Sequence, residues 1–186
     1  MPTEQQRERA LRKAGDLFYA EGINATGVAR VAQALGMSKR TLYELFRSKD
    51  ELVAEALAAR DEPIRREFFD RAETSSDDAA EQLVAAFSTL DQMLGRHGFN
   101  GCPFLRASAE IEGVNATARV VIADHKDASR QWMEDRARVA GLRDPVRLSH
   151  QLMFLFDGVL AHFVAVPDTP AISADTARVL VDAARS

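Results

Sequence analysis

The sequence predicts an all-α fold of about nine helices. Apolar residues recur along most of the chain at intervals of three and four, the period of a helix with one buried face. No segment shows the strict alternation of apolar and polar residues that a half-buried strand would have. Serine, threonine and aspartate precede the periodic segments and glycine follows several of them, which is typical of helix starts and ends.

The first helix is expected over about residues 4–21. Thr3 and Gln6 have the spacing of a capping box, in which each side chain bonds a backbone N–H of the other residue. Gly22 stands where a helix commonly ends in a left-handed residue. The expected buried face comprises Ala10, Leu11, Ala14, Leu17 and Phe18.

Two short helices joined by a tight turn follow. Thr26 is expected to cap the first, which ends at Gly36, and Ser38 is expected to cap the second. Ser48 and Glu51 have the spacing of a further capping box at the start of the next helix. Two helices of about eight residues joined in this way are typical of a helix-turn-helix. The second of them would bury Leu42, Leu45 and Phe46.

The later helices are separated by polar or glycine- and proline-containing breaks. The helix that begins at Lys49 is expected to kink at Pro63, which lacks a backbone donor, and then to resume. Residues 74–78 are polar and predict a loop. Pro103 suits the first position of a later helix. The other helices are expected from about Leu83 to Gly95, from Pro103 to Gly113, and over about 115–140, 145–166 and 173–185.

Composition excludes several classes of protein. The single cysteine, Cys102, permits no intramolecular disulfide and fits a reducing cytoplasm. The N-terminus lacks an apolar signal region, and the longest apolar stretch, residues 152–166, contains Asp157 and His162, so no membrane segment is expected. Phosphate-binding, HExxH, CxxC and nucleophile-elbow motifs are missing, and the histidines lack metal-ligand spacing. We therefore expect a cytoplasmic protein that is not an enzyme and needs no cofactor or metal.

Charge is distributed unevenly along the chain. Residues 1–50 carry nine Lys/Arg and six Asp/Glu, a formal charge of +3, whereas the remainder carries −7. A mildly basic N-terminal region allows local attraction to phosphates. The second helix of a helix-turn-helix enters the major groove with its N-terminal residues toward the base edges, where Lys and Arg donate to guanine and Thr contacts a thymine methyl group.

The expected contacts to double-stranded DNA follow from this geometry. Base contacts are expected from Lys39, Arg40 and Thr41, and phosphate contacts from Tyr43 and from the helix starts. The complete expected set is Thr26, Ser38, Lys39, Arg40, Thr41, Tyr43 and Lys49. The alternative is that these charges form a solvated helix face. Their position on the recognition helix, opposite its apolar side, favours DNA.

Over roughly residues 7–54 the sequence resembles the TetR family of bacterial transcriptional regulators. The matching residues are Ala14, Leu17, Phe18, Gly22, Thr26, Val31, Ala32, Leu35, Gly36, Met37, Ser38, Thr41, Leu42, Tyr43, Phe46, Ser48, Lys49 and Leu52. Arg40 departs from the pattern, because the family often has glycine there. A stretch of sequence Gly-Cys-Pro-Phe, Gly101–Phe104, resembles one subgroup of the family's C-terminal domains.

The resemblance implies a homodimer, a palindromic operator and usually repression. It implies a helix-turn-helix DNA-binding domain over residues 1–50 and an effector-binding and dimerisation domain over residues 51–186. Dimerisation is expected through the helices near 145–166 and 173–185, where Gly158 and Ala161 would let helices approach closely. The alternative is that the apolar residues of these helices belong to the monomer core.

A pocket for an unidentified small-molecule effector is expected among the middle helices. Its candidate residues are Phe87, Leu90, Cys102, Phe104, His125, Trp132, Met153, Phe156 and Asp157. The alternative is that the aromatic residues are core and that His125, Asp157 and His162 are solvated or paired. Cys102 lies close to an expected helix N-terminus, which favours a reactive thiolate, although a single cysteine is more often a small buried apolar residue.

The predicted function is therefore that of a transcriptional repressor released from its operator by the effector. Binding of the effector would shift the population toward a conformation in which the two DNA-binding regions no longer fit adjacent major grooves. Two alternatives stay open: a regulator that needs no effector, and a redox-responsive regulator that acts through Cys102.

Overall fold

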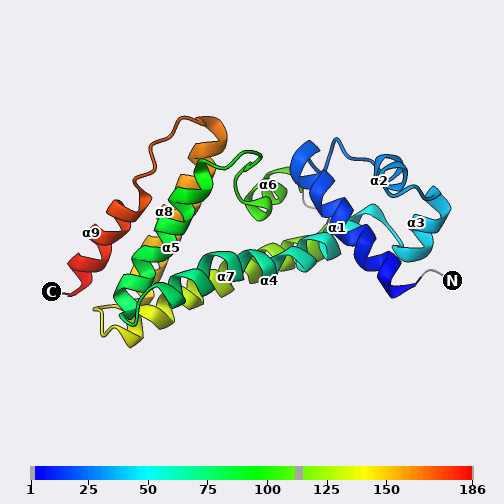
Figure 1. Ribbon diagram of the computed structural model, residues 1–186. Helices are drawn as coiled ribbons and strands as arrows, with labels where there is room; N and C mark the ends of the chain where they lie inside the picture. The colour runs from blue at the N-terminus through cyan, green and yellow to red at the C-terminus, as the bar shows by residue number, and fades with distance from the viewer. Residues whose placement is uncertain (1–2, 112–114, 186) are drawn as a thin grey trace. The chain divides into compact units, whose positions relative to one another are not determined.

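The computed structural model describes residues 3–111 and 115–185, which form nine α-helices and no strand (Figure 1). This confirms the predicted all-α class. The helices are α1 (Glu4–Glu21), α2 (Val28–Leu35), α3 (Lys39–Leu45), α4 (Lys49–Ser75), α5 (Ala79–Leu94), α6 (Pro103–Glu110), α7 (Ala116–Val139), α8 (Pro145–Ala165) and α9 (Ser173–Arg185). The expected helix end at Gly113 lies outside the described residues.

Contacts divide the chain into two compact units. The first comprises Met1–Pro63 and Pro103–His125, and the second comprises Ile64–Cys102 and Lys126–Ser186. The first unit therefore joins α1, α2, α3 and the first half of α4 to α6 and the start of α7. The functional boundary at residue 50, which the family resemblance implies, stays a prediction. The contacts group α6 with the helix-turn-helix.

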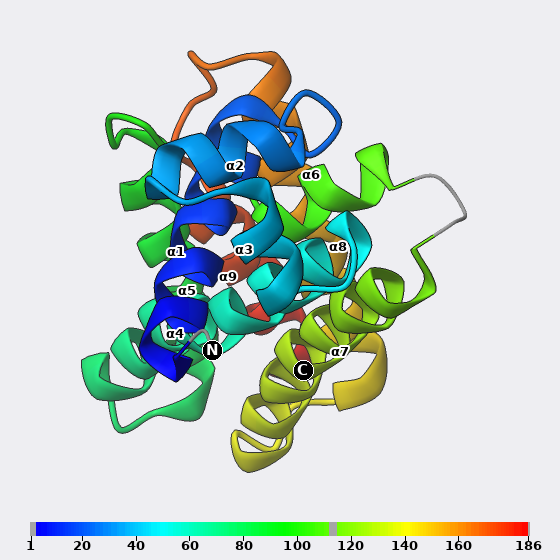
Figure 2. The same cartoon turned by 90° about the vertical axis from the view of Figure 1, so that its right-hand side faces the viewer.

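In the first unit, α2 contacts both α1 and α3 (Figure 2). The capping box of α1 forms as predicted: the Thr3 N–H donates to Gln6 Oε1 at 2.8 Å, and Thr3 Oγ1 accepts from the Gln6 N–H at 3.3 Å. Gly22 has the expected positive φ, 89°, but its ψ of 153° lies outside the left-handed helical region. Gly36 ends α2 in that region, at φ 66° and ψ 30°, as predicted.

The cap expected at Thr26 is wrong. Gly27 is the N-cap of α2, and no side chain bonds the free N–H groups there. Thr26 is fully buried, and its backbone N–H donates to the Gly22 carbonyl at 3.2 Å, so the residue belongs to the preceding turn. The tertiary burial of Thr26 therefore overrides its local preference for capping.

The cap predicted for α3 is confirmed, because Ser38 Oγ accepts from the Thr41 N–H at 3.0 Å. Only half of the box expected for α4 forms. Ser48 Oγ accepts from the Glu51 N–H at 3.1 Å, but the Glu51 carboxylate accepts from the N–H of Arg47, one residue before the expected position.

Helix α4 is one continuous helix that contains Pro63, and it extends further than expected. Thr74 and Ser75, part of the predicted loop, instead form its last turn. Their hydroxyls donate to the carbonyls of Asp70 and Ala72 at 2.9 and 2.7 Å. The expected loop is therefore reduced to the residues just before α5, where Asp78 Oδ1 accepts from the Ala80 N–H at 2.8 Å.

In the second unit, α9 packs against α5 and α8 (Figure 1). Arg178 of α9 forms a bidentate ion pair with Glu81 of α5, and this hydrogen bonding lowers the pKa of Glu81. Within the described chain, α8 alone is long and apolar enough to cross a membrane. Length and composition of this kind are equally typical of helices at the core or interface of a protein without a membrane.

Candidate nucleic-acid interface

The recognition helix α3 presents its cations on the exposed face and its apolar residues on the buried face. Lys39 and Arg40 lie in its first turn, and the side chain of Arg40 is 89% exposed. Arg40 Nε donates to Glu44 Oε1 one turn later at 3.1 Å, which holds the guanidinium along the helix. Tyr43 is also exposed. The buried face consists of Leu42 and Leu45, with Phe46 directly after the helix.

Ser38 and Thr41 are bonded to each other at the start of α3. Besides the capping bond to the Thr41 N–H, the two hydroxyl oxygens lie 2.9 Å apart. The pair therefore fixes the first turn of the recognition helix. Contacts from these two hydroxyls to DNA stay a prediction.

The other two expected phosphate contacts lie in different surroundings. Lys49 is half-buried, and its Nζ donates to the backbone carbonyl of Ile23 at 2.6 Å. Lys49 therefore links the start of α4 to the turn after α1. Thr26 is fully buried, which counts against the phosphate contact expected of it.

Two further cations near the recognition helix were missed by reasoning from motifs. Arg47 is exposed two residues after the end of α3, and Arg30 is an exposed residue of α2. Arg30 Nη2 donates to Glu21 Oε1 at 2.6 Å, and this hydrogen bond raises the pKa of Arg30. The basic charge of residues 1–50 was the sequence feature that could have indicated them.

The residues expected to line an effector pocket are divided between the two units. Phe104 and His125 belong to the first unit, where their rings stack at 3.7 Å between centroids. The Nδ1 atom of His125 lies 2.7 Å from Asp61 Oδ1. His125 is therefore a buried, hydrogen-bonded residue that packs on α6 and bonds α4.

The other expected pocket residues lie in the second unit. Phe156 meets the rings of Phe68 and Phe87 edge-on at 5.3 and 5.6 Å. Leu90 and Met153 are buried as well. The three phenylalanine rings form an aromatic cluster centred on Phe156.

Trp132, the remaining aromatic candidate, is only partly buried, and it contacts residues outside the cluster around Phe156. It stacks on Phe69 at 4.4 Å, and its Nε1 donates to Glu73 Oε1 at 2.7 Å. The indole thus links α7 to the end of α4.

Asp157 and Cys102 are brought together by a lysine that the sequence did not single out. Lys126 Nζ donates to Asp157 Oδ1 at 2.5 Å and lies 3.8 Å from the Sγ atom of the buried Cys102. A partly buried carboxylate needs such a partner. His162, the remaining polar candidate, is exposed on α8. Lysine and aspartate 31 positions apart give no local pattern that would have predicted this pair.

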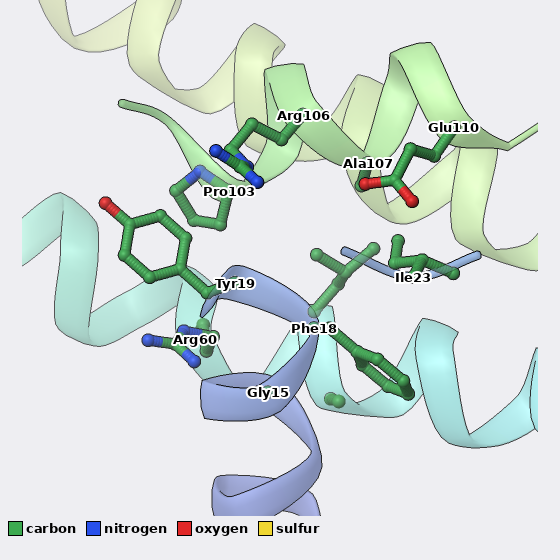
Figure 3. A pocket seen from close by; sticks show the side chains of 11 residues that line it. Gly15, Phe18, Tyr19, Ile23, Arg60, Pro103, Arg106, Ala107 and Glu110 are labelled. Carbon is green, nitrogen blue, oxygen red and sulfur yellow. The ribbon is translucent and has the colours of Figure 1, made fainter. Parts of the chain in front are cut away.

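A cavity that the sequence did not predict lies between α1, α4 and α6 of the first unit (Figure 3). Its volume of about 20 Å³ is enough for a water molecule. The guanidinium carbons of Arg60 and Arg106 lie 5.5 and 6.0 Å from the centroid of the Tyr19 ring. Glu110 and Ile23 line the same cavity.

Comparison with known proteins identifies the family of the chain. The model of the family described as "Bacterial regulatory proteins, tetR family" matches residues 10–56. A solved TetR-type transcriptional regulator from Streptomyces avermitilis MA-4680 is 30% identical, with a TM-score of 0.87 over 97% of this chain and 98% of that one. SCO4454, a TetR-family transcriptional regulator from Streptomyces coelicolor, is 27% identical, with a TM-score of 0.79 over 98% and 95%.

A more distant structure shares the fold. It is AibR in complex with isovaleryl coenzyme A and operator DNA, at 18% identity and a TM-score of 0.67 over 92% and 95% of the two chains. No curated protein matches the sequence. The 30% identity over nearly the whole of both chains, together with the match across the helix-turn-helix, shows that the chain belongs to the TetR family of bacterial regulatory proteins.

Proposed function

We propose that the protein is a cytoplasmic repressor that binds a palindromic operator as a homodimer and is released by a small molecule. The observation that carries this proposal is the exposed, cationic first turn of α3, backed by a buried apolar face. Such a helix can enter a major groove with Lys39 and Arg40 toward the base edges. In this proposal residues 1–50 contact DNA, and residues 51–186 serve effector binding and dimerisation.

The need for a second copy is supported by the outer face of α8 and α9. Phe154 of α8 and Val179 of α9 are 73% and 67% exposed. On the same side of α8, Gly158 and Ala161 are exposed, and a Cβ atom added at Gly158 would meet nothing within 4 Å. Phe163 is buried in the monomer, as the alternative required, so the dimer face consists of the residues beside it. A single recognition helix reads few base pairs, and two copies would read both half-sites.

The proposed effector site is the aromatic cluster around Phe156 together with the ion pair of Lys126 and Asp157, the residue that follows Phe156 in α8. Separation of Lys126 from Asp157 in a partly buried place would leave two charges without partners. An effector that inserts there should therefore carry its own anionic or strongly accepting group. That AibR was solved with an acyl coenzyme A and operator DNA supports a ligand-responsive regulator on this fold.

The redox alternative has one specific observation in its favour. Lys126 Nζ lies 3.8 Å from Cys102 Sγ, so a cation contacts the thiol in the partly buried site. Cys102 also lies in the Gly101–Phe104 stretch on which the proposed subgroup rests. If Cys102→Ser protein is still released from DNA by peroxide, this alternative is excluded. A regulator without any effector would show no thermal shift with any member of a broad metabolite library.

Operator binding is tested by selecting duplexes from a random-sequence pool with the wild-type protein. Lys39→Ala and Arg40→Ala should each weaken binding to the selected duplex by about 1–3 kcal/mol and relax its sequence preference. Arg12→Ala is the matched control, because Arg12 is an exposed cation of α1 that pairs with Glu8 on the same helix. Unchanged binding by both α3 variants would contradict the assignment of α3 as the recognition helix.

A further inference from the structure

The turn between α1 and α2 is held by the last residue of α6. Glu110 Oε2 accepts from the backbone N–H of Asn24 at 2.8 Å, and the Glu110 carbonyl accepts from Asn24 Nδ2 at 3.2 Å. The two residues are 86 positions apart in the sequence. A carboxylate that accepts from a backbone N–H makes a charge-assisted hydrogen bond, which is among the stronger kinds.

The shape of this turn is matched to the carboxylate. Gly22 has a φ of 89°, which L side chains rarely adopt. A Cβ atom at Gly22 would lie 3.2 Å from both carboxylate oxygens of Glu110. Glycine at this position therefore permits both the backbone turn and the close approach of α6.

The same turn is bonded from its other side by α4. Lys49 Nζ donates to the Ile23 carbonyl at 2.6 Å. Ile23 directly precedes Asn24, so two consecutive residues of the turn are bonded, one to α4 and the other to α6. The turn leads directly into α2 of the helix-turn-helix.

The start of α7 is bonded to the other end of the helix-turn-helix. Asn115 Oδ1 caps α7 by accepting from the Ala118 N–H at 2.9 Å, and Asn115 Nδ2 donates to the Asp50 carbonyl at 2.9 Å. Glu110 thus contacts the residues that precede α2, and Asn115 contacts those that follow α3. This agrees with the grouping of Pro103–His125 with Met1–Pro63 in one compact unit.

We propose that Glu110 is a positioning residue for the recognition helix. Through Asn24 it fixes the turn before α2, so that α6 sets the placement of α2 and α3 directly, in addition to any effect carried along α4. The inference rests on the proposed function, because the placement matters through operator binding. A shift of α6 that breaks the bond would loosen the turn and lower the affinity for the operator.

The test compares Glu110→Ala and Glu110→Gln with Asp124→Ala. The first variant removes the acceptor, and the second keeps an acceptor oxygen but removes the charge. Asp124 is an exposed carboxylate of α7 in the same unit and serves as the matched control. Asn24→Ala removes only the bond to the Glu110 carbonyl. If Glu110→Ala does not fold, Asn24→Ala and Glu110→Gln are measured in its place.

Two quantities are measured for each variant: amide hydrogen exchange over residues 22–26, and affinity for the selected and for an unrelated duplex. For Glu110→Ala we expect exchange of the Asn24 amide to rise about tenfold or more, because a hydrogen bond to a charged group is lost. Affinity for the selected duplex should fall several-fold, with affinity for the unrelated duplex unchanged. Glu110→Gln should lie between this variant and the wild type, and Asp124→Ala should match the wild type.

The outcomes separate the inference from the proposed function. If the wild type enriches no duplex, operator binding itself is wrong, and the positioning role falls with it. If the wild type enriches a duplex and Glu110→Ala binds it equally well, only the positioning role is overturned. Unchanged exchange at residues 22–26 would also overturn it, as would an equal loss of affinity for both duplexes.

Discussion

At the scale of single residues, the cations of the helix-turn-helix fall into two kinds. Lys39 and Arg40 project from the first turn of α3, where the sequence pattern placed them. Lys49 is one of the residues that match the family pattern, but its ammonium group bonds the Ile23 carbonyl. A motif specifies residue types and their spacing, but it does not specify the environment of each side chain. Whether the charge of Lys49 faces solvent or a backbone carbonyl depends on a turn 26 positions earlier.

Lys49→Ala should therefore affect both stability and DNA binding. Loss of the bond to Ile23 should lower the free energy of unfolding by about 1–2 kcal/mol, measured by urea denaturation. Affinity for selected and unrelated duplexes should fall together. The slope of the logarithm of affinity against the logarithm of salt concentration should decrease in magnitude by about one, as for the loss of one phosphate contact. Lys13→Ala, which alters an exposed lysine of α1, is the control. A Lys49→Ala protein with wild-type stability would show that the bond to Ile23 contributes nothing.

At the scale of helices, α9 shows which features the local sequence pattern predicts and which it does not. The sequence predicted its range, Ser173–Arg185, and the structure has the same bounds. Its start is nevertheless fixed by a residue of α5. The carboxylate of Asp91 accepts from the N–H groups of Ser173 and Ala174, each at 3.0 Å, and from the Ser173 hydroxyl at 2.7 Å.

Asp91→Ala should loosen the first turn of α9. The change leaves two N–H groups without their acceptor, and the buried Ser173 hydroxyl keeps only its longer bond to the Phe87 carbonyl at 3.3 Å. We expect this to cost about 2–3 kcal/mol of unfolding free energy. Urea denaturation measures the loss, and amide exchange at Ser173 and Ala174 locates it. Asp175→Ala, an exposed change in the first turn of the same helix, should cost only a few tenths of a kcal/mol. Equal costs for the two variants would contradict the capping role of Asp91.

Helix positions were predictable because they depend on periodicity and on caps within a few residues. The range of α1, the left-handed Gly36 and the cap at Ser38 are examples. The two capping errors have different origins. Thr26 does not cap α2 because tertiary packing buries it. The Glu51 carboxylate accepts from the N–H of Arg47, four residues earlier, so a local alternative replaces the expected bond to Ser48.

At the scale of the whole molecule, the candidate site was predicted unevenly. The exposed cations of α3 follow from the motif. The expected pocket residues share only apolar or titratable character, and the structure distributes them between two units. The partner of Asp157, Lys126, was not predictable, because the pairing depends on how α7 and α8 pack.

The proposed dimer face gives a test at this scale. Phe154→Glu should convert the protein to a monomer at micromolar concentration, because two desolvated carboxylates would replace apolar contact between the copies. Light scattering measures the mass, and affinity for the palindromic duplex should fall at least about a hundredfold. Monomer stability should change little, since Phe154 is largely exposed.

Val139→Glu is the matched control for this prediction. Val139 is 70% exposed but lies at the end of α7, outside the proposed face, so the variant should stay dimeric. A Phe154→Glu protein that remains a dimer would show that another surface joins the copies.

The bonds from Glu110 and Asn115 to the helix-turn-helix also affect which gene segments such regulators can exchange by recombination. A hybrid gene joined at residue 50 would place a foreign turn opposite Glu110 and a foreign helix start opposite Asn115. Inheritance of residues 1–63 together with residues 103–125 would preserve both contacts, although these segments are not adjacent in the gene. New combinations of DNA specificity and effector response should therefore arise more readily by substitution within α3 than by exchange of the first fifty codons.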